Sequence, residues 1–286
     1  MARVSYSQYS TWHGCPQKYK LQYIDKLGET GSNIHFIFGT ALHETVQHFL
    51  SVMYGVSKKQ ALEIDMTLLL QKNLIKEFTD TRKKQKGVDP CTQEELEEAF
   101  GDGRLALKQF TSKLTKYYSK SGFKLLGIEL PLNAKIRDNV HFIGFIDVIL
   151  QDISSDEIII IDIKTSTKGW SKWQKNDKTK TSQLLLYKKF YSEKYNVSMD
   201  RIRVEYHIFK RKIDENAQYP IPRISKFVPA NGKPSINMAW KGFMEFVDTV
   251  FDEDGNRRTN IDYRTNVTRL CDWCEFSERK ICKDFK

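Results

Sequence analysis

The sequence of 286 residues lacks long apolar runs. No stretch approaches the roughly 20 apolar residues that span a bilayer, and the opening "MARVSYSQYSTWHG" lacks the apolar core of a secretory signal peptide. Internal repeats and low-complexity linkers are also missing, so no domain boundary is evident. We therefore expect a soluble, cytoplasmic protein that does not contact membranes and folds as a single domain over residues 1–286.

The sequence contains fewer acidic than basic residues. The chain has 36 Asp and Glu against 46 Lys and Arg, which gives a net charge of +10. This balance favours contact with a polyanion such as nucleic acid, but it is also compatible with a solvated, lysine-rich surface. Because 40% of the residues are hydrophobic, the chain can bury a sizeable core.

Helical patterns dominate the first 120 residues. The expected helices are a short one after Ser5 or Ser7 that is interrupted near Gly14 and Pro16, one in "GTALHETVQHFLSVMYG", one over about 58–86, and one that begins at the Thr92–Glu95 capping box and runs towards Tyr118.

After Gly122 the pattern changes to strands. Strands are expected at 123–136, 140–150, 157–164 and 201–209, with a helix over 181–195, loops near 84–92, 168–180 and 213–234, and a C-terminal helix and cysteine segment over about 235–286. The fold class is therefore α/β, with a helical part over about 1–120 and a mixed central sheet over about 121–212.

Charged residues end the most apolar strand, "IIIIDIKTS". Asp162 and Lys164 alternate along this strand, so they project from one face. Asp147 ends the phrase "GFID" on the preceding strand, and pairing of the two strands would bring the carboxylates together. Such a pair suits Mg²⁺ or Mn²⁺, with Lys164 able to act on a bound water. A partly buried Asp–Lys ion pair with no catalytic role explains the same triplet.

These motifs resemble the PD-(D/E)XK nuclease superfamily, in particular its RecB-like branch, which includes the AddB nuclease domain and the CRISPR-adaptation nucleases. The resemblance covers "GFID", "IDIKTS" and "QLLLY" in order, and it extends to "FGTALHE", "GIELPL" and the opening "SYSQYSTWHGCPQKYKLQYI".

The resemblance implies a role for each matching residue. His43, Asp147, Asp162 and the Ile163 carbonyl would bind the divalent metal, and Lys164 would act on the attacking water. Two further positions, Gln183 and Tyr187, would support the site or contact DNA. Because they lie four apart, a helix puts both on one face; an ordinary amphipathic surface is the alternative. Glu129 would be the acidic residue of the strand in "GIELPL", or a plain charge at a strand edge.

Four cysteines form a second set. Cys271 and Cys274 have Cys-x-x-Cys spacing, Cys282 follows, and Cys15 lies near the other end of the chain, while Cys91 stands apart. In a reducing compartment such thiols suit a metal centre better than disulfides, and spacing alone favours zinc. The RecB-like resemblance instead implies a 4Fe-4S cluster held by these four, although the gap before Cys282 is longer than the family's usual form.

A basic loop follows the Asp162 strand. It contains Lys168, Trp170, Lys172, Trp173 and Lys175. The lysines could neutralise phosphates and the tryptophans could stack on unpaired bases. Alternatively, the loop is solvated and its tryptophans pack into the core.

The resemblance implies a metal-dependent DNA nuclease, most simply an exonuclease in recombination, repair or phage DNA processing, with linear or single-stranded DNA ends as substrate and a helicase or recombination protein as a candidate partner. A non-catalytic DNA-binding or assembly subunit that keeps the fold is the main alternative, and a hydrolase of small phosphate esters is a second. The sequence leaves the oligomeric state open.

Overall fold

A mixed β-sheet forms the centre of the protein. The computed structural model describes residues 1–28, 33–214 and 216–282, and within them six strands form one sheet in the order β1-β3-β4-β5-β6, with β2 paired to β3. The strands are β1 (Ala2–Val4), β2 (Phe123–Arg137), β3 (Val140–Asp152), β4 (Ile158–Ser166), β5 (Ile202–Lys210) and β6 (Ile224–Phe227). The expected α/β fold with a mixed central sheet is confirmed.

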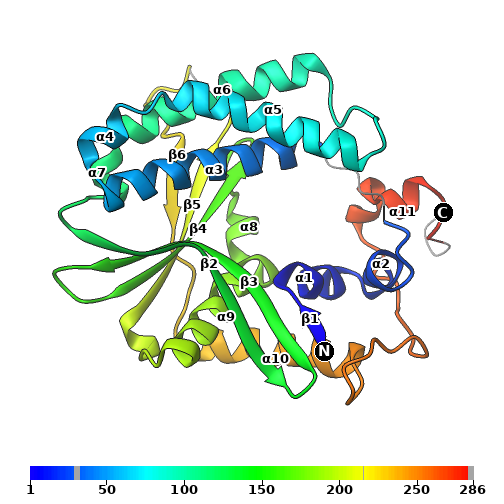
Figure 1. Cartoon of the computed structure of the whole chain (residues 1–286). Helices are drawn as coiled ribbons and strands as arrows, with labels where there is room; N and C mark the ends of the chain where they lie inside the picture. Colours follow the sequence, from blue (N-terminus) through cyan, green and yellow to red (C-terminus); the bar gives the residue numbers. More distant parts are fainter. Residues whose placement is uncertain (29–32, 215, 283–286) are drawn as a thin grey trace.

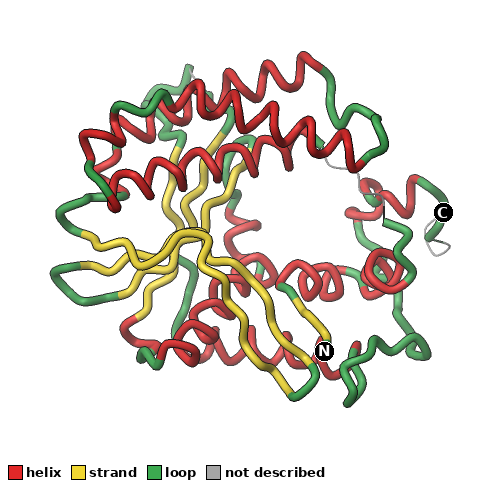
Figure 2. The backbone as a smooth tube through the Cα atoms, viewed as in Figure 1, coloured by secondary structure: helices red, strands yellow, loops and turns green. Residues whose placement is uncertain are grey.

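Strand β3 organises the sheet. Its partner β2 runs antiparallel along nearly its whole length, so β2 occupies one edge. The other edge is shared: β1 pairs with Val140–Phe142 in parallel, and β4 pairs with Val148–Gln151 in antiparallel. Residues 143–147 lie between these two partners, and there the strands diverge (Figure 2).

Helices cover both faces of the sheet (Figure 1). One layer consists of α3 (Ile34–Gly55), α4 (Lys58–Leu62), α5 (Met66–Lys84), α6 (Gln93–Ser112) and α7 (Leu114–Tyr117). The other consists chiefly of α1 (Tyr6–Gly14), α9 (Lys178–Tyr195) and α10 (Lys233–Val250). On β4, alternate isoleucines face the two layers, since Ile159, Ile161 and Ile163 pack in the first core and Ile158 and Ile160 in the second.

Two helix predictions were too long. The helix expected over about 58–86 is divided into α4 and α5, because the Asp65 side chain accepts hydrogen bonds from the Thr67 and Leu68 N–H groups and so starts a new helix. The helix expected to run towards Tyr118 begins at the predicted Thr92–Glu95 capping box, but α6 ends at Ser112 and a separate turn, α7, follows.

Two expected loops contain regular structure. Residues 168–180 include α8 (Lys172–Asn176), which has its own Ser171–Gln174 capping box, and the start of α9. Within the expected loop 213–234, of which residue 215 lies outside the described residues, β6 pairs with β5. The remaining short elements are α2 (Pro16–Tyr19), the π-helical turn η1 (Lys20–Ile24), and η2 (Met199–Arg201), η3 (Arg269–Trp273) and α11 (Glu275–Glu278).

The two ends of the chain lie side by side. Figure 1 shows α2 beside the segment that carries α11. The Gln17 N–H donates to the Arg264 carbonyl, and Arg257 donates to the Tyr19 hydroxyl at 3.1 Å. This arrangement brings Cys15 to the C-terminal cysteines.

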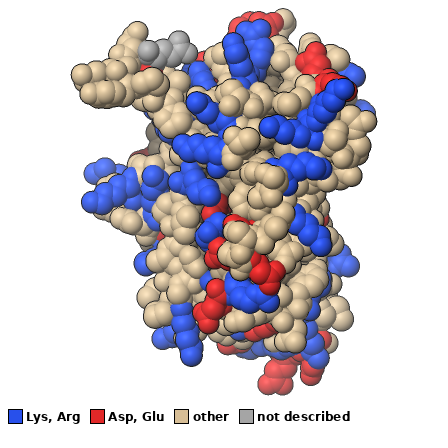
Figure 3. Space-filling model, turned by 90° about the vertical axis from the view of Figure 1, so that its left-hand side faces the viewer, with Lys and Arg blue, Asp and Glu red and all other residues tan. Residues whose placement is uncertain are grey.

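Basic and acidic side chains are interspersed on the face shown in Figure 3. The net charge therefore does not by itself locate a site for a polyanion. In the described part of the chain, no helix is both long enough and apolar enough to cross a membrane.

Candidate active site

Asp147 and Asp162 lie where β3 and β4 part. The ladder between the strands ends at the pair Val148–Ile161, and the next position on each strand is an aspartate. In place of a backbone pair, the Asp147 carboxylate accepts a hydrogen bond from the Ile163 N–H at 2.7 Å. The divergence of the strands thus leaves two carboxylates facing a break in the sheet.

Both carboxylates are buried. Asp162 is 2% exposed and Asp147 is 9% exposed. Burial raises the pKa of Asp147 to about 7 and that of Asp162 to about 6, and in each case the nearby Lys164 ammonium opposes the shift. A cation between the two would favour their charged forms.

Lys164 pairs with Asp162. Its ammonium lies 3.1 Å from Asp162 Oδ1 and 2.8 Å from Oδ2, but only the contact with Oδ1 has hydrogen-bond geometry. Burial lowers the lysine pKa, but attraction by Asp162 and Asp147 outweighs burial and leaves the pKa above its usual value. Lys164 is therefore a cation at neutral pH, suited to stabilising negative charge.

His43 reaches the site from α3. Its Nδ1 lies 3.7 Å from Asp147 Oδ2. Burial, with repulsion from Lys164, lowers the histidine pKa to about 4, so the imidazole is neutral at neutral pH, the form that binds metals. Gly39, one turn earlier, explains the approach of the helix, since a Cβ there would lie 3.2 Å from the Thr165 hydroxyl of β4.

Glu129 adopts an unusual backbone conformation. Its φ is +48°, in the left-handed region that non-glycine residues rarely occupy. Its Oε1 accepts a hydrogen bond from Gln47 Nε2 at 2.6 Å, one turn beyond His43 on α3. The negative charge of Glu129 opposes the lowering of the His43 pKa and adds to the raising of the Asp147 pKa, so Glu129 belongs electrostatically to the site.

Gln183 and Tyr187 enter from α9, on the opposite layer from His43. The Gln183 amide donates to the Tyr187 hydroxyl at 3.3 Å. Burial raises the pKa of Tyr187, and the charges of Asp162 and Asp147 raise it further. A Cβ at Gly144 would lie 2.9 Å from the Tyr187 ring, so the glycine of "GFID" makes room for this tyrosine.

Sequence reasoning missed two tyrosines beside the site. Tyr6 donates a hydrogen bond to the Thr179 carbonyl, and Tyr206, in register with Asp162 on β5, donates to the Lys180 carbonyl at 2.7 Å. Burial and the Asp162 charge both raise the pKa of Tyr6. The alternation of β5 could have indicated Tyr206; nothing local to the first residues points Tyr6 towards this strand.

The basic loop divides into packed and exposed residues. Trp170 packs against Tyr206, with ring centroids 4.8 Å apart, whereas Trp173 on α8 is 88% exposed. Lys168 and Lys172 are exposed, and the Lys175 ammonium lies 5.7 Å from the centre of the Phe227 ring. Trp173 is thus the tryptophan of this loop that remains accessible.

The donors at the strand break fit a divalent metal only in part. Among the described residues, no three His, Cys, Asp or Glu side chains converge as a metal-binding group. However, Asp162 Oδ2 is buried without a hydrogen bond, and Mg²⁺ is typically held by one or two carboxylates together with water and substrate phosphate. Two carboxylates, a neutral imidazole and a nearby carbonyl meet that requirement once substrate is present.

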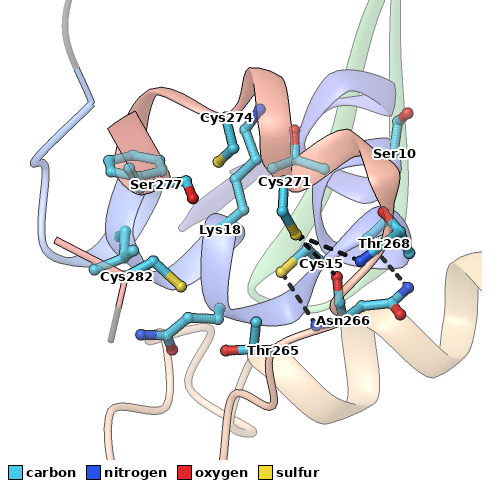
Figure 4. Close-up of a pocket in the computed structure, with 15 residues that line it drawn as sticks. Ser10, Cys15, Lys18, Thr265, Asn266, Thr268, Cys271, Cys274, Ser277 and Cys282 are labelled. Atoms are coloured by element: carbon cyan, nitrogen blue, oxygen red, sulfur yellow. Dashed lines mark hydrogen bonds between the residues drawn. The ribbon is translucent and has the colours of Figure 1, made fainter. Parts of the chain in front are cut away.

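The four cysteines line one cavity of about 290 Å³ (Figure 4). Two are linked through Asn266, whose N–H donates to Cys15 Sγ at 3.4 Å and whose carbonyl accepts from the Cys271 thiol at 3.8 Å. All five cysteines are free thiols, and Cys91 lies elsewhere, packed against the core of the first helical layer. The structure therefore collects the four cysteines of the expected set in one place and leaves out the fifth.

Comparison with known proteins agrees with a nuclease of the α/β class. The sequence profile of the PD-(D/E)XK nuclease superfamily matches residues 3–283, nearly the whole chain. The protein belongs to this superfamily. A crystal structure of a protein from Eubacterium rectale, named provisionally as an exonuclease, is 12% identical over 94% of this chain and 91% of that chain, with a TM-score of 0.48. No curated protein matches the sequence.

Proposed function

We propose that the protein is a divalent-metal-dependent deoxyribonuclease that acts as an exonuclease in recombination, repair or phage DNA processing. The observation that carries the proposal is the buried group of Asp147, Asp162, Lys164 and His43 at the break between β3 and β4, in a chain of the PD-(D/E)XK superfamily. Buried charges of this kind are costly unless they are paired or bind a cation.

The metal would be held by Asp147, Asp162, His43 and the Ile163 carbonyl. When bound, Mg²⁺ or Mn²⁺ would polarise the scissile phosphate and lower the pKa of the attacking water. The raised pKa values of both aspartates support this assignment, because a bound cation would recover the cost of ionising them in a buried site.

Lys164 orients the attacking water and stabilises the reacting phosphate. Hydrolysis forms a P–O bond from water and breaks the P–O bond to a sugar oxygen, which takes up a proton as it leaves. Negative charge grows on the phosphate during this step, and a fixed ammonium lowers its energy. The ion pair with Asp162 keeps the lysine charged and in place.

Glu129, Gln183 and Tyr187 support the site. The Gln47–Glu129 contact joins β2 to the helix that carries His43, and the Gln183–Tyr187 pair fixes the other wall. Of this pair, the half-buried Gln183 is the one proposed to contact DNA, since Tyr187 is buried.

Residues of the basic loop bring the DNA to the site. The exposed Lys168 and Lys172 and the half-buried Lys175 neutralise phosphates, and Trp173 offers a free face to an unpaired base. Trp170 supports this loop by packing against Tyr206.

The proposal includes a 4Fe-4S cluster held by the cysteines and, with it, membership of the RecB-like branch. The cavity lined by Cys15, Cys271, Cys274 and Cys282 supports one shared centre for the four thiols, although no three of them converge as a metal-binding group among the described residues. Zinc remains the alternative. The same proposal includes a cytoplasmic location and a helicase or recombination protein as partner.

A substrate panel tests the function. Purified protein is incubated with linear duplex, circular duplex and single-stranded DNA, with Mg²⁺, Mn²⁺ or EDTA. We expect metal-dependent release of nucleotides from DNA with ends and none from circles. Cleavage of circles would show an endonuclease, and DNA binding without cleavage under any condition would show a non-catalytic subunit.

A further inference from the structure

A second cavity lies on the side of α9 away from the catalytic strands. Its volume is about 710 Å³, and its walls come from α1, the start of α9, the region of β6 and α10. None of Asp147, Asp162, Lys164 and His43 lines it. Helix α9 contributes to both places, with Gln183 and Tyr187 at the catalytic site and Ser182 and Leu185 at the cavity.

The charged residues of this cavity favour an anion. Lys175, Lys178 and Lys241 line it from three different helices, against a single carboxylate, Glu245. His13 stands at the same wall, where its Nδ1 lies 3.2 Å from the Thr179 hydroxyl. Three ammonium groups around one cavity would repel one another less with a phosphate between them.

The other walls suit a sugar and a base. Five residues that carry a hydroxyl group are among those that line the cavity: Tyr9, Thr179, Thr181, Ser182 and Ser235. The Thr181 and Ser182 hydroxyls donate to backbone carbonyls of α9 and its N-cap, and each can still accept a hydrogen bond. An apolar side is formed by Leu185, Phe227 and Met238, and Met238 is 60% exposed although it is a large hydrophobic residue. Cations, hydroxyls and an apolar wall in one cavity match the three parts of a nucleotide.

We propose that this cavity binds one nucleoside 5′-phosphate unit. Lys178 and Lys241 contact the phosphate, and the apolar wall that includes Met238 contacts the base. The unit comes either from a free nucleotide or from a nucleotide of a DNA strand that passes α9. This binding goes beyond the proposed hydrolysis, because a nucleoside monophosphate contains no phosphodiester bond to cut.

Calorimetric titration with dAMP, in EDTA, tests the proposal on the full-length protein. Lys178→Ala/Lys241→Ala removes one lysine of the cavity from each of α9 and α10. Its matched control, Lys189→Ala/Lys233→Ala, removes the same charge from the same helices at positions that do not line the cavity. We expect the cavity variant to weaken dAMP binding about tenfold or more and the control less than twofold.

A variant that keeps every charge tests whether dAMP binds inside the cavity and not merely to nearby lysines. Ala230 lies exposed at the cavity, so Ala230→Trp adds bulk there without disturbing a buried position, and it should also weaken dAMP binding. Competition of dAMP by the oligonucleotide dT8 would identify a strand as the source, and lack of competition a free nucleotide. Equal affinities in the two double variants, absence of dAMP binding up to millimolar concentration, or equal binding of inorganic phosphate would overturn the proposal.

Discussion

The strand break proposed as the catalytic site and the cysteine cavity are built in opposite ways. At the strand break, side chains already hold one another: Asp147 accepts from Ile163, Lys164 pairs with Asp162, and Gln47 holds Glu129. In the cysteine cavity, the thiols of Cys15 and Cys271 instead make long contacts of 3.4 to 3.8 Å with the backbone of Asn266 and Thr268. The first region is held together by its own side chains, whereas the second would gain such links from the metal centre proposed for its thiols.

The two regions also differ in how they connect the chain. The strand break uses neighbouring strands and the helices packed on them. The cysteine cavity joins position 15 to positions 271–282, so a bound centre there would close nearly the whole chain into one loop. Damage to the first region should therefore remove chemistry, and damage to the second should remove stability.

Changes at the strand break should have the largest effect. Lys164→Ala or Asp162→Ala should reduce the rate of DNA cleavage by about a hundredfold to a thousandfold or more, because a transition-state charge contact or a metal ligand is lost. DNA affinity should change little, since the phosphate contacts proposed for the basic loop are kept. Cleavage rates and binding by fluorescence anisotropy measure the two effects separately.

The control for this test is Lys124→Ala, which removes an exposed lysine of β2. Circular dichroism establishes that each variant is folded. Wild-type cleavage by a folded Lys164→Ala protein would place the chemistry at another site.

Cysteine substitution should act through folding. Cys274→Ala should remove the broad absorption at about 400 nm expected of an iron–sulfur cluster in protein purified without oxygen, and it should lower the free energy of unfolding by about 3 kcal/mol or more. Cys91→Ala, outside the cavity, should keep both. Colourless protein that contains stoichiometric zinc would replace the cluster with zinc, and metal-free protein of unchanged stability would remove the metal centre altogether.

The sequence predicts best those features that are set by neighbouring residues. Alternation along β4 places Asp162 and Lys164 on one face, and the Thr92–Glu95 capping box starts α6 where it was expected. Prediction from the sequence fails where contacts between residues far apart in the chain determine the structure. The three residues of β1 are a strand because they pair with Val140–Phe142, and Asp65 divides a helical pattern that otherwise continues.

The candidate site shows the same division. The "GFID" and "IDIKTS" motifs indicate two adjacent carboxylates, but the strand divergence that separates Asp147 from Asp162 depends on β1 taking over the edge of β3. The left-handed conformation of Glu129 and the arrival of Tyr6 also come from tertiary packing. Such features have no local signal in the sequence.

The buried carboxylates should give the metal-free protein a specific pH dependence. The pKa values of Asp147 and Asp162 in the folded state, about 7 and about 6, lie above the ordinary aspartate value of 3.8. Their contribution to stability is therefore fully present below about pH 4 and is lost as the pH rises through 6 to 7. Asp162→Asn stays neutral, so in EDTA at pH 8 it should be about 2 kcal/mol more stable than the wild type.

Denaturant unfolding between pH 5 and pH 8 measures this difference. Added Mn²⁺ should stabilise the wild type at pH 8 and stabilise Asp162→Asn much less, because a carboxylate ligand is lost. Parallel pH profiles for the two proteins in EDTA would contradict the assignment of a buried, ionising Asp162.

The smallest expected effect distinguishes the two tryptophans that follow β4. Trp170 packs against Phe227 and against Tyr206, the register partner of Asp162, whereas Trp173 is 88% exposed on α8. Trp173→Ala should therefore weaken binding of single-stranded DNA about threefold to tenfold, the worth of one stacked base at an open position, and leave the unfolding temperature unchanged. Trp170→Ala should instead lower the unfolding temperature, because it leaves a cavity beside the catalytic strand. If both variants lowered stability and neither changed DNA affinity, α8 would belong to the framework of the site, and the DNA would have to approach Asp162 from the side of α3.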